Sequence, residues 1–193
     1  VKDRANALRN PYAHVRDAAL DFAAIAGSPM LWDPIRFHET CPSSDGACAV
    51  VITDEEGGKA AAAAGRPPAW ILGTSSRSEP PAFPGRDPVR PQACLTCAED
   101  VYAQAGITRP REQVDMAELY VPFSWHEPMW LEAHHLADEG EGWKLTDAGE
   151  TEITGSMPIN CSGGVLSSNP IGASGLLRFA EAALQVRGMA GEH

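Results

Sequence analysis

Short apolar runs alternate with longer helical stripes along most of this chain. Four runs rich in β-branched or other apolar residues predict buried strands at 47–53, 69–73, 116–120 and 157–160. Stripes with apolar residues three and four positions apart predict helices at 92–105, 124–137 and 172–186. Because strands that alternate with helices form sheets covered by helices, the pattern indicates a layered α/β architecture.

The remaining segments carry weaker signals. Helical pieces are predicted between residues 4 and 24, with a break at Asn10 and Pro11. A short alanine-rich helix is predicted at 59–64, and the acidic, glycine-punctuated stretch at 138–152 predicts a loop. These elements complete the predicted order without changing the fold class.

A proline-rich segment at 65–91 is the clearest boundary in the chain. It holds seven of the 16 prolines, so we expect a division into 1–64 and 65–193. Four arginines against Glu79 and Asp87 also make residues 66–90 locally basic in an acidic protein. Such a loop either contacts a phosphorylated ligand or is simply solvated.

Composition narrows the class of protein. Of the 193 residues, 44% are hydrophobic, which is enough for a packed core, and no apolar run approaches the roughly 18 residues of a membrane span. The formal charge of −11 disfavours binding to nucleic acid or to an anionic membrane. Five scattered cysteines, and no apolar signal-peptide stretch after Lys2 and Arg4, predict a reduced cytoplasmic protein.

The stretch at 155–188 organises the predicted fold. It reads as a strand, a glycine-rich elbow and the start of a helix near Gly172 and Gly175. Unpaired N–H groups at a helix start carry partial positive charge and stabilise an oxyanion or a phosphate. A phosphate loop is excluded because its lysine is absent, and the alternative is that the glycines only let the helix pack on a sheet.

Tyr120 ends the predicted strand at 116–120. Ligands of α/β sheets often bind at the carboxyl ends of strands, where this phenol would project. The alternative is an ordinary aromatic residue at a strand end.

Three further patterns contain cysteine or histidine, the residue types that bind metals or act as nucleophiles. Cys94 and Cys97 have redox or metal spacing, but no second pair accompanies them. His126 starts a zinc-protease-like pattern that fails, because Trp130 stands where the second histidine is needed. Cys161 lies on the glycine-rich turn, yet nothing adjacent in sequence supplies the basic partner that a reactive thiolate needs.

Several blocks together resemble the thiolase superfamily, of the lipid-carrier (sterol carrier) type. The family's late signature is an asparagine, two residues, a glycine pair and then His-Pro-x-Gly-x-x-Gly, and this chain has NCSGG at 160–164 and NPIGASG at 169–175. YVPF at 120–123 is similar to a strand-end signature of the family, and CPSSDGA at 41–47 to the element that closes its first half. One residue departs from the late signature, because Asn169 replaces the histidine.

The resemblance implies a thiolase-type layered αβαβα fold. The chain would represent the end of the first half (1–64) and most of the C-terminal half (65–193), without its last strands. It implies an acyl-CoA enzyme of lipid or steroid side-chain metabolism that makes or breaks a carbon–carbon bond beside a thioester. Acyl transfer (thiolysis) and retro-aldol cleavage both stay open, because an amide at Asn169 cannot take a proton as the histidine does.

The resemblance also implies site residues and partners. Tyr120 and Asn169 are the expected catalytic residues. No metal or cofactor is expected beyond the coenzyme A thioester that serves as substrate, and the expected partners are a second copy in a homodimer and a small OB-fold protein. The alternative is a catalytically silent thiolase-fold subunit that binds acyl-CoA or lipid. The expected substrate-binding residues are Ser162, Gly163, Gly172 and His126.

Overall fold

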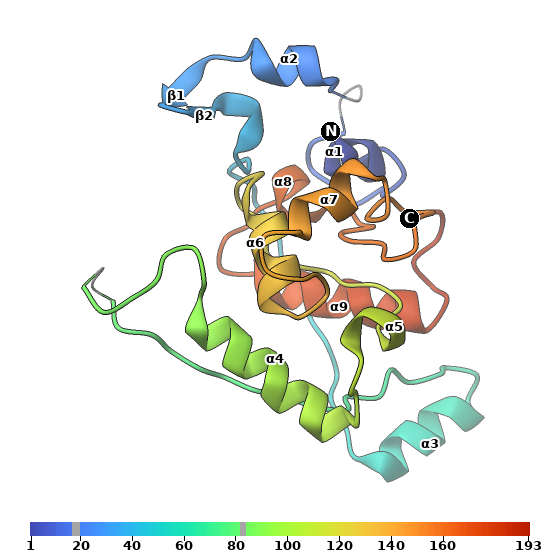
Figure 1. Ribbon diagram of the computed structural model, residues 1–193. Coiled ribbons are helices and arrows are strands. Elements are labelled where there is room, and N and C mark those ends of the chain that lie inside the picture. Colours follow the sequence, from blue (N-terminus) through green and yellow to red (C-terminus); the bar gives the residue numbers. More distant parts are fainter. Residues whose placement is uncertain (17–19, 82–83) are drawn as a thin grey trace. The chain divides into compact units, whose positions relative to one another are not determined.

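Helices supply most of the regular structure in the computed structural model, which describes residues 1–16, 20–81 and 84–193 (Figure 1). None of the helices in these residues is both long and apolar enough to cross a bilayer. The elements in chain order are α1 (Lys2–Ala7), α2 (Phe22–Ala26), β1 (Met30–Trp32), β2 (Ile35–Arg36), the 3₁₀ helix η1 (Phe37–Glu39), α3 (Glu55–Ala63), α4 (Gln92–Ala105), α5 (Pro110–Gln113), α6 (His126–Ala133), α7 (Gly142–Asp147), α8 (Gly164–Ser167) and α9 (Ser174–Val186).

Two compact units divide the chain. The first unit joins both ends of the chain to a three-residue segment that carries Tyr120, and the second unit holds most of the middle. The expected division into 1–64 and 65–193 stays a prediction. The first unit comprises Val1–Trp70, Tyr120–Pro122 and Asn160–His193, and the second comprises Ile71–Leu119 and Phe123–Ile159.

In the first unit, α1 packs against α8. The Asn6 side chain donates to the Asn160 carbonyl (3.1 Å), and the Asn10 side chain donates to the Ser162 carbonyl (2.9 Å). Gly163 is required at this contact, because its φ is +89° and a Cβ there would lie 2.6 Å from the Ala7 Cβ. The N-terminal segment, which comprises α1 and the residues just after it, therefore holds the elbow although the partners are more than 150 residues apart along the chain.

The helix predicted at 172–186 is confirmed as α9, which begins two residues later than expected. The buried face of α9 is not the predicted apolar face, because its buried residues are Ser174, Arg178 and Glu181. Leu176 and Phe179 are exposed instead. An apolar helix face open to solvent marks a surface that another element normally covers.

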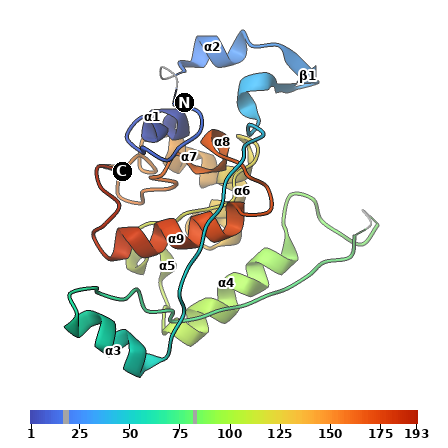
Figure 2. The ribbon, with the colours of Figure 1, turned by 180° about the vertical axis from the view of Figure 1, so that it is seen from behind.

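The prediction of a strand at 47–53 is wrong, because the structure has no strand there. The segment crosses α9 (Figure 2), where the Cys48 thiol contacts the Leu176 carbonyl (3.7 Å). Within the described residues, residues 45–53 take part in no backbone hydrogen bond, and the Val51 side chain is 96% exposed. A strand forms only when its N–H and C=O groups make hydrogen bonds with a neighbouring strand. The β-branched residues at 47–53 favour a strand, but these hydrogen bonds are missing among the described residues.

The other three strand predictions fare differently. The segment at 69–73 is also extended without a strand partner among the described residues, so that prediction is wrong as assigned. The segments at 116–120 and 157–160 meet at one parallel bridge between Ala117 and Ile159, where the Ala117 N–H donates to the Pro158 carbonyl (3.0 Å). Their side-by-side placement agrees with the α/β prediction, although neither reaches the length of a strand.

In the second unit, the helix predicted at 92–105 is confirmed with both boundaries as α4. The preceding chain runs antiparallel along it, because Thr74 pairs with Gln104 (3.1 Å) and Ser75 with Asp100 (2.7 Å). The prediction of a helix at 124–137 was too long, since α6 ends before His135, whose φ is +54°. The loop predicted at 138–152 was partly wrong because it contains α7.

Exposed apolar surface leads to the first testable expectation. We expect the isolated 193-residue chain to have a free energy of unfolding below about 5 kcal/mol, the low end for natural domains. It should also bind a dye that reports exposed apolar surface, because Val51, Leu176 and Phe179 face solvent. A urea titration with dye binding measures both, and a cooperative, dye-free monomer of 20.5 kDa with high stability would contradict the expectation.

Candidate functional site

Asn169 lies at the elbow before α9, 7% exposed, with its side chain held at both ends. The Ser174 hydroxyl donates to Asn169 Oδ1 (2.8 Å), and Asn169 Nδ2 donates to the Cys41 sulfur (3.1 Å). The backbone N–H of Asn169 donates to Ser44 Oγ (3.1 Å). These contacts fix the amide where the family signature has a histidine.

The 41–44 segment is the second element of this site. The Ser44 N–H donates to the Asn169 carbonyl (3.3 Å), so the two residues are joined twice. Ser44 Oγ also lies 2.7 Å from His14 Nδ1, and the His14 N–H donates to Ser168 Oγ (2.7 Å). Two segments of the N-terminal part of the chain therefore hold the elbow in place.

Tyr120 belongs to the first unit, as Asn169 does, and it begins the short segment Tyr120–Pro122. Cys41, which contacts the Asn169 amide, also holds this segment. The N–H of Cys41 donates to the carbonyl of Pro122 (2.9 Å), two residues after Tyr120. Tyr120 is 38% exposed, which leaves its side chain open to a ligand. Burial, and then the charge of Cys41, raise the pKa of Tyr120 above its ordinary value.

Two roles are open to the phenol of Tyr120, hydrogen-bond donor and base. A tyrosine that is protonated at neutral pH donates a hydrogen bond and polarises a carbonyl, whereas a base needs a lowered pKa. Tyr120 therefore suits the role of donor. Its placement in one pocket with Asn169 stays a prediction.

The start of α9 is open on the side of its two glycines. A Cβ built on Gly172 or Gly175 meets no atom of the described chain within 4 Å. Packing among the described residues therefore requires neither glycine. N–H groups at a helix start have no partner within the helix, and such groups bind oxygen atoms of anionic ligands.

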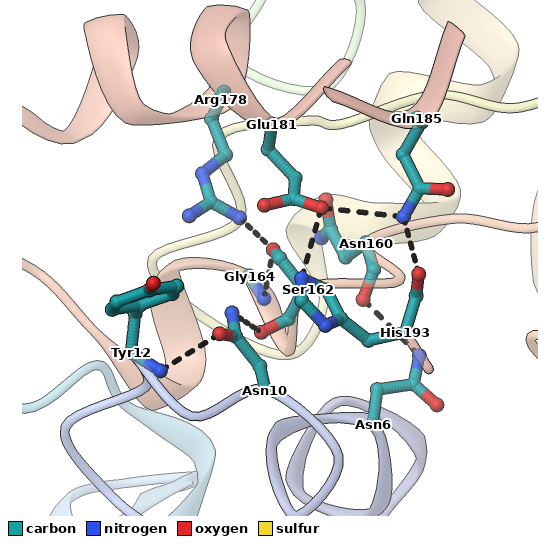
Figure 3. A network of polar contacts seen from close by, with 10 residues as sticks. All are labelled: Asn6, Asn10, Tyr12, Asn160, Ser162, Gly164, Arg178, Glu181, Gln185 and His193. Atoms are coloured by element: carbon teal, nitrogen blue, oxygen red, sulfur yellow. Dashed lines mark hydrogen bonds and ion pairs between the residues drawn. The ribbon is translucent and has the colours of Figure 1, made fainter. Parts of the chain in front are cut away.

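Ser162 sits in a buried polar network (Figure 3). Its hydroxyl accepts hydrogen bonds from the Arg178 guanidinium and from the Gly164 N–H (3.1 Å), and its carbonyl accepts from Asn10. Nearby, Glu181 pairs with His193 (3.2 Å). These contacts serve the fold, and substrate contact by Ser162, Gly163 or Gly172 stays a prediction.

His126, the remaining predicted substrate-binding residue, begins α6 in the second unit. Its ring stacks on Trp125 at 3.8 Å between centroids and lies 5.5 Å from the rings of Phe123 and Trp130. Burial lowers the pKa of His126, which keeps the imidazole neutral at pH 7. Its neighbour Glu127 is buried and accepts from two threonines of the α7 region, so the His-Glu pair serves packing rather than metal binding.

The other candidate patterns of the sequence do not form sites in the described residues. No group of three or more metal-binding side chains occurs among them. Cys161 is buried, which does not fit a nucleophile that a substrate must reach. In the basic loop, Arg77, Arg86 and Arg90 each pair with a carboxylate, which favours the solvated alternative.

Cys94 lies 3.6 Å from His134 Nε2, and burial, then the charges of Cys97 and Glu79, raise its pKa to about 11. The protonated thiol is a poor nucleophile at neutral pH. Tyr102 donates to the His134 carbonyl (2.7 Å), and burial with the charge of Cys94 raises its pKa to about 12. The Cys94–Cys97 pair is therefore placed for packing rather than for redox chemistry.

These two raised pKa values predict an alkaline loss of stability. Cys94 and Tyr102 bind protons more tightly in the folded than in the unfolded chain. Their contribution is therefore complete below the unfolded pKa values and is lost as pH rises through about 11 and 12. Urea unfolding should show roughly 1–2 kcal/mol less stability from Cys94 at pH 11 than at pH 8, and Cys94→Ser should remove that part. An unchanged pH dependence in the variant would contradict this assignment.

Comparison with known proteins supplies the family. Residues 80–193 match the family described as thiolase C-terminal domain-like. Human sterol carrier protein 2 is 30% identical over 99% of this chain, and the acetyl-CoA acetyltransferase of Methanothermobacter thermautotrophicus is 29% identical over 100% of it. The chain spans only 35% and 49% of these two relatives.

A solved structure gives the fold. The Ltp2-ChsH2(DUF35) aldolase matches 98% of this chain with a TM-score of 0.80 and 23% identity, and the match covers 49% of that chain. The predicted resemblance to sterol-carrier-type thiolases and the predicted thiolase-type α/β fold are both confirmed. This chain therefore corresponds to about half of the solved chain that it matches.

Proposed function

We propose that this chain, which belongs to the thiolase C-terminal domain-like family, carries the later part of the active site of a thiolase-type acyl-CoA enzyme. The observation that carries the proposal is the fixed Asn169 amide beside the open start of α9. Tyr120 adds a protonated phenol in the same unit. Such a set of donors suits the oxygen of a thioester on which negative charge develops.

Both reactions of this class pass through an enolate of the thioester. When a carbon–carbon bond beside the thioester breaks, its electron pair moves to the α-carbon and is shared with the thioester oxygen. In our proposal Tyr120 and Asn169 donate hydrogen bonds to that oxygen, and the helix start adds its partial positive charge. The enolate then takes a proton at the α-carbon to give the shorter acyl-CoA.

Between the two reactions, we favour retro-aldol cleavage of a β-hydroxyacyl thioester. Acyl transfer needs an activated cysteine, and the amide of Asn169 cannot accept the cysteine's proton. Retro-aldol cleavage needs no acyl-enzyme, only a base for the β-hydroxyl proton, and that base would come from the part of the enzyme outside this chain. The names of the relatives include both an acetyltransferase and an aldolase, so the reaction is decided by experiment.

The test uses the complete enzyme, meaning this chain joined to or co-expressed with the polypeptide that completes the fold. It is incubated separately with a β-hydroxyacyl-CoA and with a 3-ketoacyl-CoA plus free coenzyme A, and products are measured by mass spectrometry. Cleavage of the β-hydroxyacyl-CoA to an aldehyde or ketone and a shorter acyl-CoA supports our proposal. Thiolysis of the 3-ketoacyl-CoA alone shows acyl transfer, and no turnover of either shows a silent subunit.

Assembly is the second part of the proposal. We propose a homodimer with a small OB-fold partner, supported by the aldolase of similar structure, whose name includes a second component with a DUF35 domain. The exposed apolar residues at Val51, Leu176 and Phe179 also favour a chain that associates with other polypeptide. The silent-subunit alternative is favoured by Asn169, which stands where the family signature has a histidine. Light scattering of the complete enzyme measures the assembly.

A further inference from the structure

We propose that Cys41 is a positioning residue for the donor set, meaning the two proposed hydrogen-bond donors Tyr120 and Asn169. Its sulfur holds the Asn169 amide, and its backbone N–H holds the segment that carries Tyr120. The effect of Cys41 on catalysis rests on the proposed function, whereas its two contacts are seen in the structure. Its sulfur accepts from Asn169 Nδ2 at 3.1 Å, and its N–H donates to the Pro122 carbonyl at 2.9 Å. In the sequence, Cys41 stands out only as the first residue of the CPSSDGA motif.

The contact with the sulfur determines where the second amide hydrogen points. An asparagine side chain has two donors on Nδ2 and one acceptor oxygen. The Ser174 hydroxyl occupies Oδ1, and the Cys41 sulfur takes one Nδ2 hydrogen. With both ends of the amide held, its plane is fixed. The remaining hydrogen of Asn169 is therefore the one that we assign to the thioester oxygen.

The backbone contact serves the other donor. Pro122 follows Tyr120 by two residues, and the hydrogen bond from the Cys41 N–H holds this short segment. The charge of the sulfur also reaches the phenol, where it raises the pKa of Tyr120 in the same direction as burial does. One residue thus acts on the geometry of Asn169 and on the environment of Tyr120.

Two substitutions separate the sulfur from the backbone contact. Cys41→Ala removes the acceptor for Asn169 Nδ2, whereas Cys41→Ser keeps an acceptor of a different size. Both leave the N–H to Pro122 in place. The matched control is Cys48→Ala, because Cys48 is a partly buried cysteine of the neighbouring segment that contacts α9 and lies outside the donor set.

In the complete enzyme, we expect Cys41→Ala to lower kcat by roughly 10-fold, the value of one lost neutral hydrogen bond, with little change in KM. Cys41→Ser should recover most of the loss, and Cys48→Ala should match the parent enzyme. Equal kcat for Cys41→Ala and the parent would overturn the proposal. So would an equal loss for Cys41→Ala and Cys48→Ala, since it would show only a general packing effect.

A second readout needs no turnover and uses the 193-residue chain alone. Nuclear magnetic resonance follows the side-chain NH₂ of Asn169, which we expect to exchange its hydrogens faster in Cys41→Ala than in the parent and in Cys48→Ala. Ultraviolet absorbance follows the phenolate of Tyr120, with Tyr120→Phe as the blank. Because the interaction with Cys41 raises the pKa of Tyr120, that pKa should fall in Cys41→Ala and Cys41→Ser.

The two readouts keep the positioning role distinct from the proposed function. If the Asn169 amide and the Tyr120 titration change in Cys41→Ala while the complete enzyme turns over no acyl-CoA, the proposed function fails and the positioning role stands. If both signals in Cys41→Ala match those of the parent, the positioning role is overturned whatever the activity.

Discussion

Replacement of Tyr120 by phenylalanine in the complete enzyme is expected to lower kcat by roughly 100-fold or more, as the loss of an oxyanion donor does. The change removes one hydroxyl and little volume. The raised pKa of Tyr120 keeps the hydroxyl protonated at neutral pH, and our proposal has it donate a hydrogen bond in the transition state. KM should change less than kcat, since the hydrogen bond strengthens as charge develops on the thioester oxygen.

The matched control for this variant is Tyr12→Phe. Tyr12 belongs to the same unit, and its side chain is 88% exposed, so loss of its hydroxyl should leave kcat unchanged. The raised pKa also predicts that the Tyr120-dependent activity persists into alkaline solution and falls only above the ordinary tyrosine value of about 10. Unchanged kinetics of Tyr120→Phe on every acyl-CoA that the enzyme turns over would contradict the role.

Replacement of Asn169 by aspartate is the second large effect that we expect. The side chains have nearly the same shape, but a carboxylate cannot donate a hydrogen bond. The variant loses the donor to Cys41 and places a negative charge beside the developing enolate. We expect kcat to fall by roughly 100-fold to 1,000-fold, measured by steady-state kinetics. A thermal melt that matches the parent excludes unfolding as the cause.

Asn169→His tests the same position in the opposite direction, because it restores the histidine of the family signature. We expect it to raise acyl transfer relative to retro-aldol cleavage, since an imidazole can take the proton of a cysteine. The ratio of the two products measures the change. Retained retro-aldol activity in both Asn169→Asp and Asn169→His would show that this residue lies outside the reaction.

Helices with a clear apolar stripe could be predicted from the sequence, and strands without their partners could not. The boundaries of α4 follow from residues 92–105 alone, because helical hydrogen bonds are local. The segment at 45–53 has the β-branched residues of a strand, but its hydrogen-bonding partners are other strands, which the described chain does not supply. The match to a solved structure over 98% of this chain shows the fold to which the segment belongs.

The candidate site could be proposed from the sequence because its residues stand in recognisable motifs. Tyr120 and Asn169 were identified by their places in those motifs, and the structure shows what holds the Asn169 amide. The contribution of Cys41 was missed because its partner is 128 residues away in the sequence. The CPSSDGA motif was a usable signal, since a cysteine and a serine at fixed spacing meet the same elbow residue.

Ser162 shows what a motif leaves out, namely the partners of the side chain in the folded chain. Its place beside the glycine pair predicts contact with substrate, yet its hydroxyl accepts from Arg178 and Gly164 in a buried network. Only the folded chain brings Arg178 to this position, since the two residues are 16 apart and on different elements. A polar residue near a functional loop serves packing as readily as catalysis.

The most direct test of the central claim is a crystal structure of the complete enzyme with a non-cleavable acyl-CoA analogue. The distance to measure joins the thioester oxygen to Tyr120 Oη and to Asn169 Nδ2. Our account predicts that both lie within hydrogen-bonding distance, about 3 Å, with the oxygen at the start of α9. A thioester bound elsewhere, or side chains of Tyr120 and Asn169 more than roughly 8 Å apart, beyond two such contacts, would contradict it.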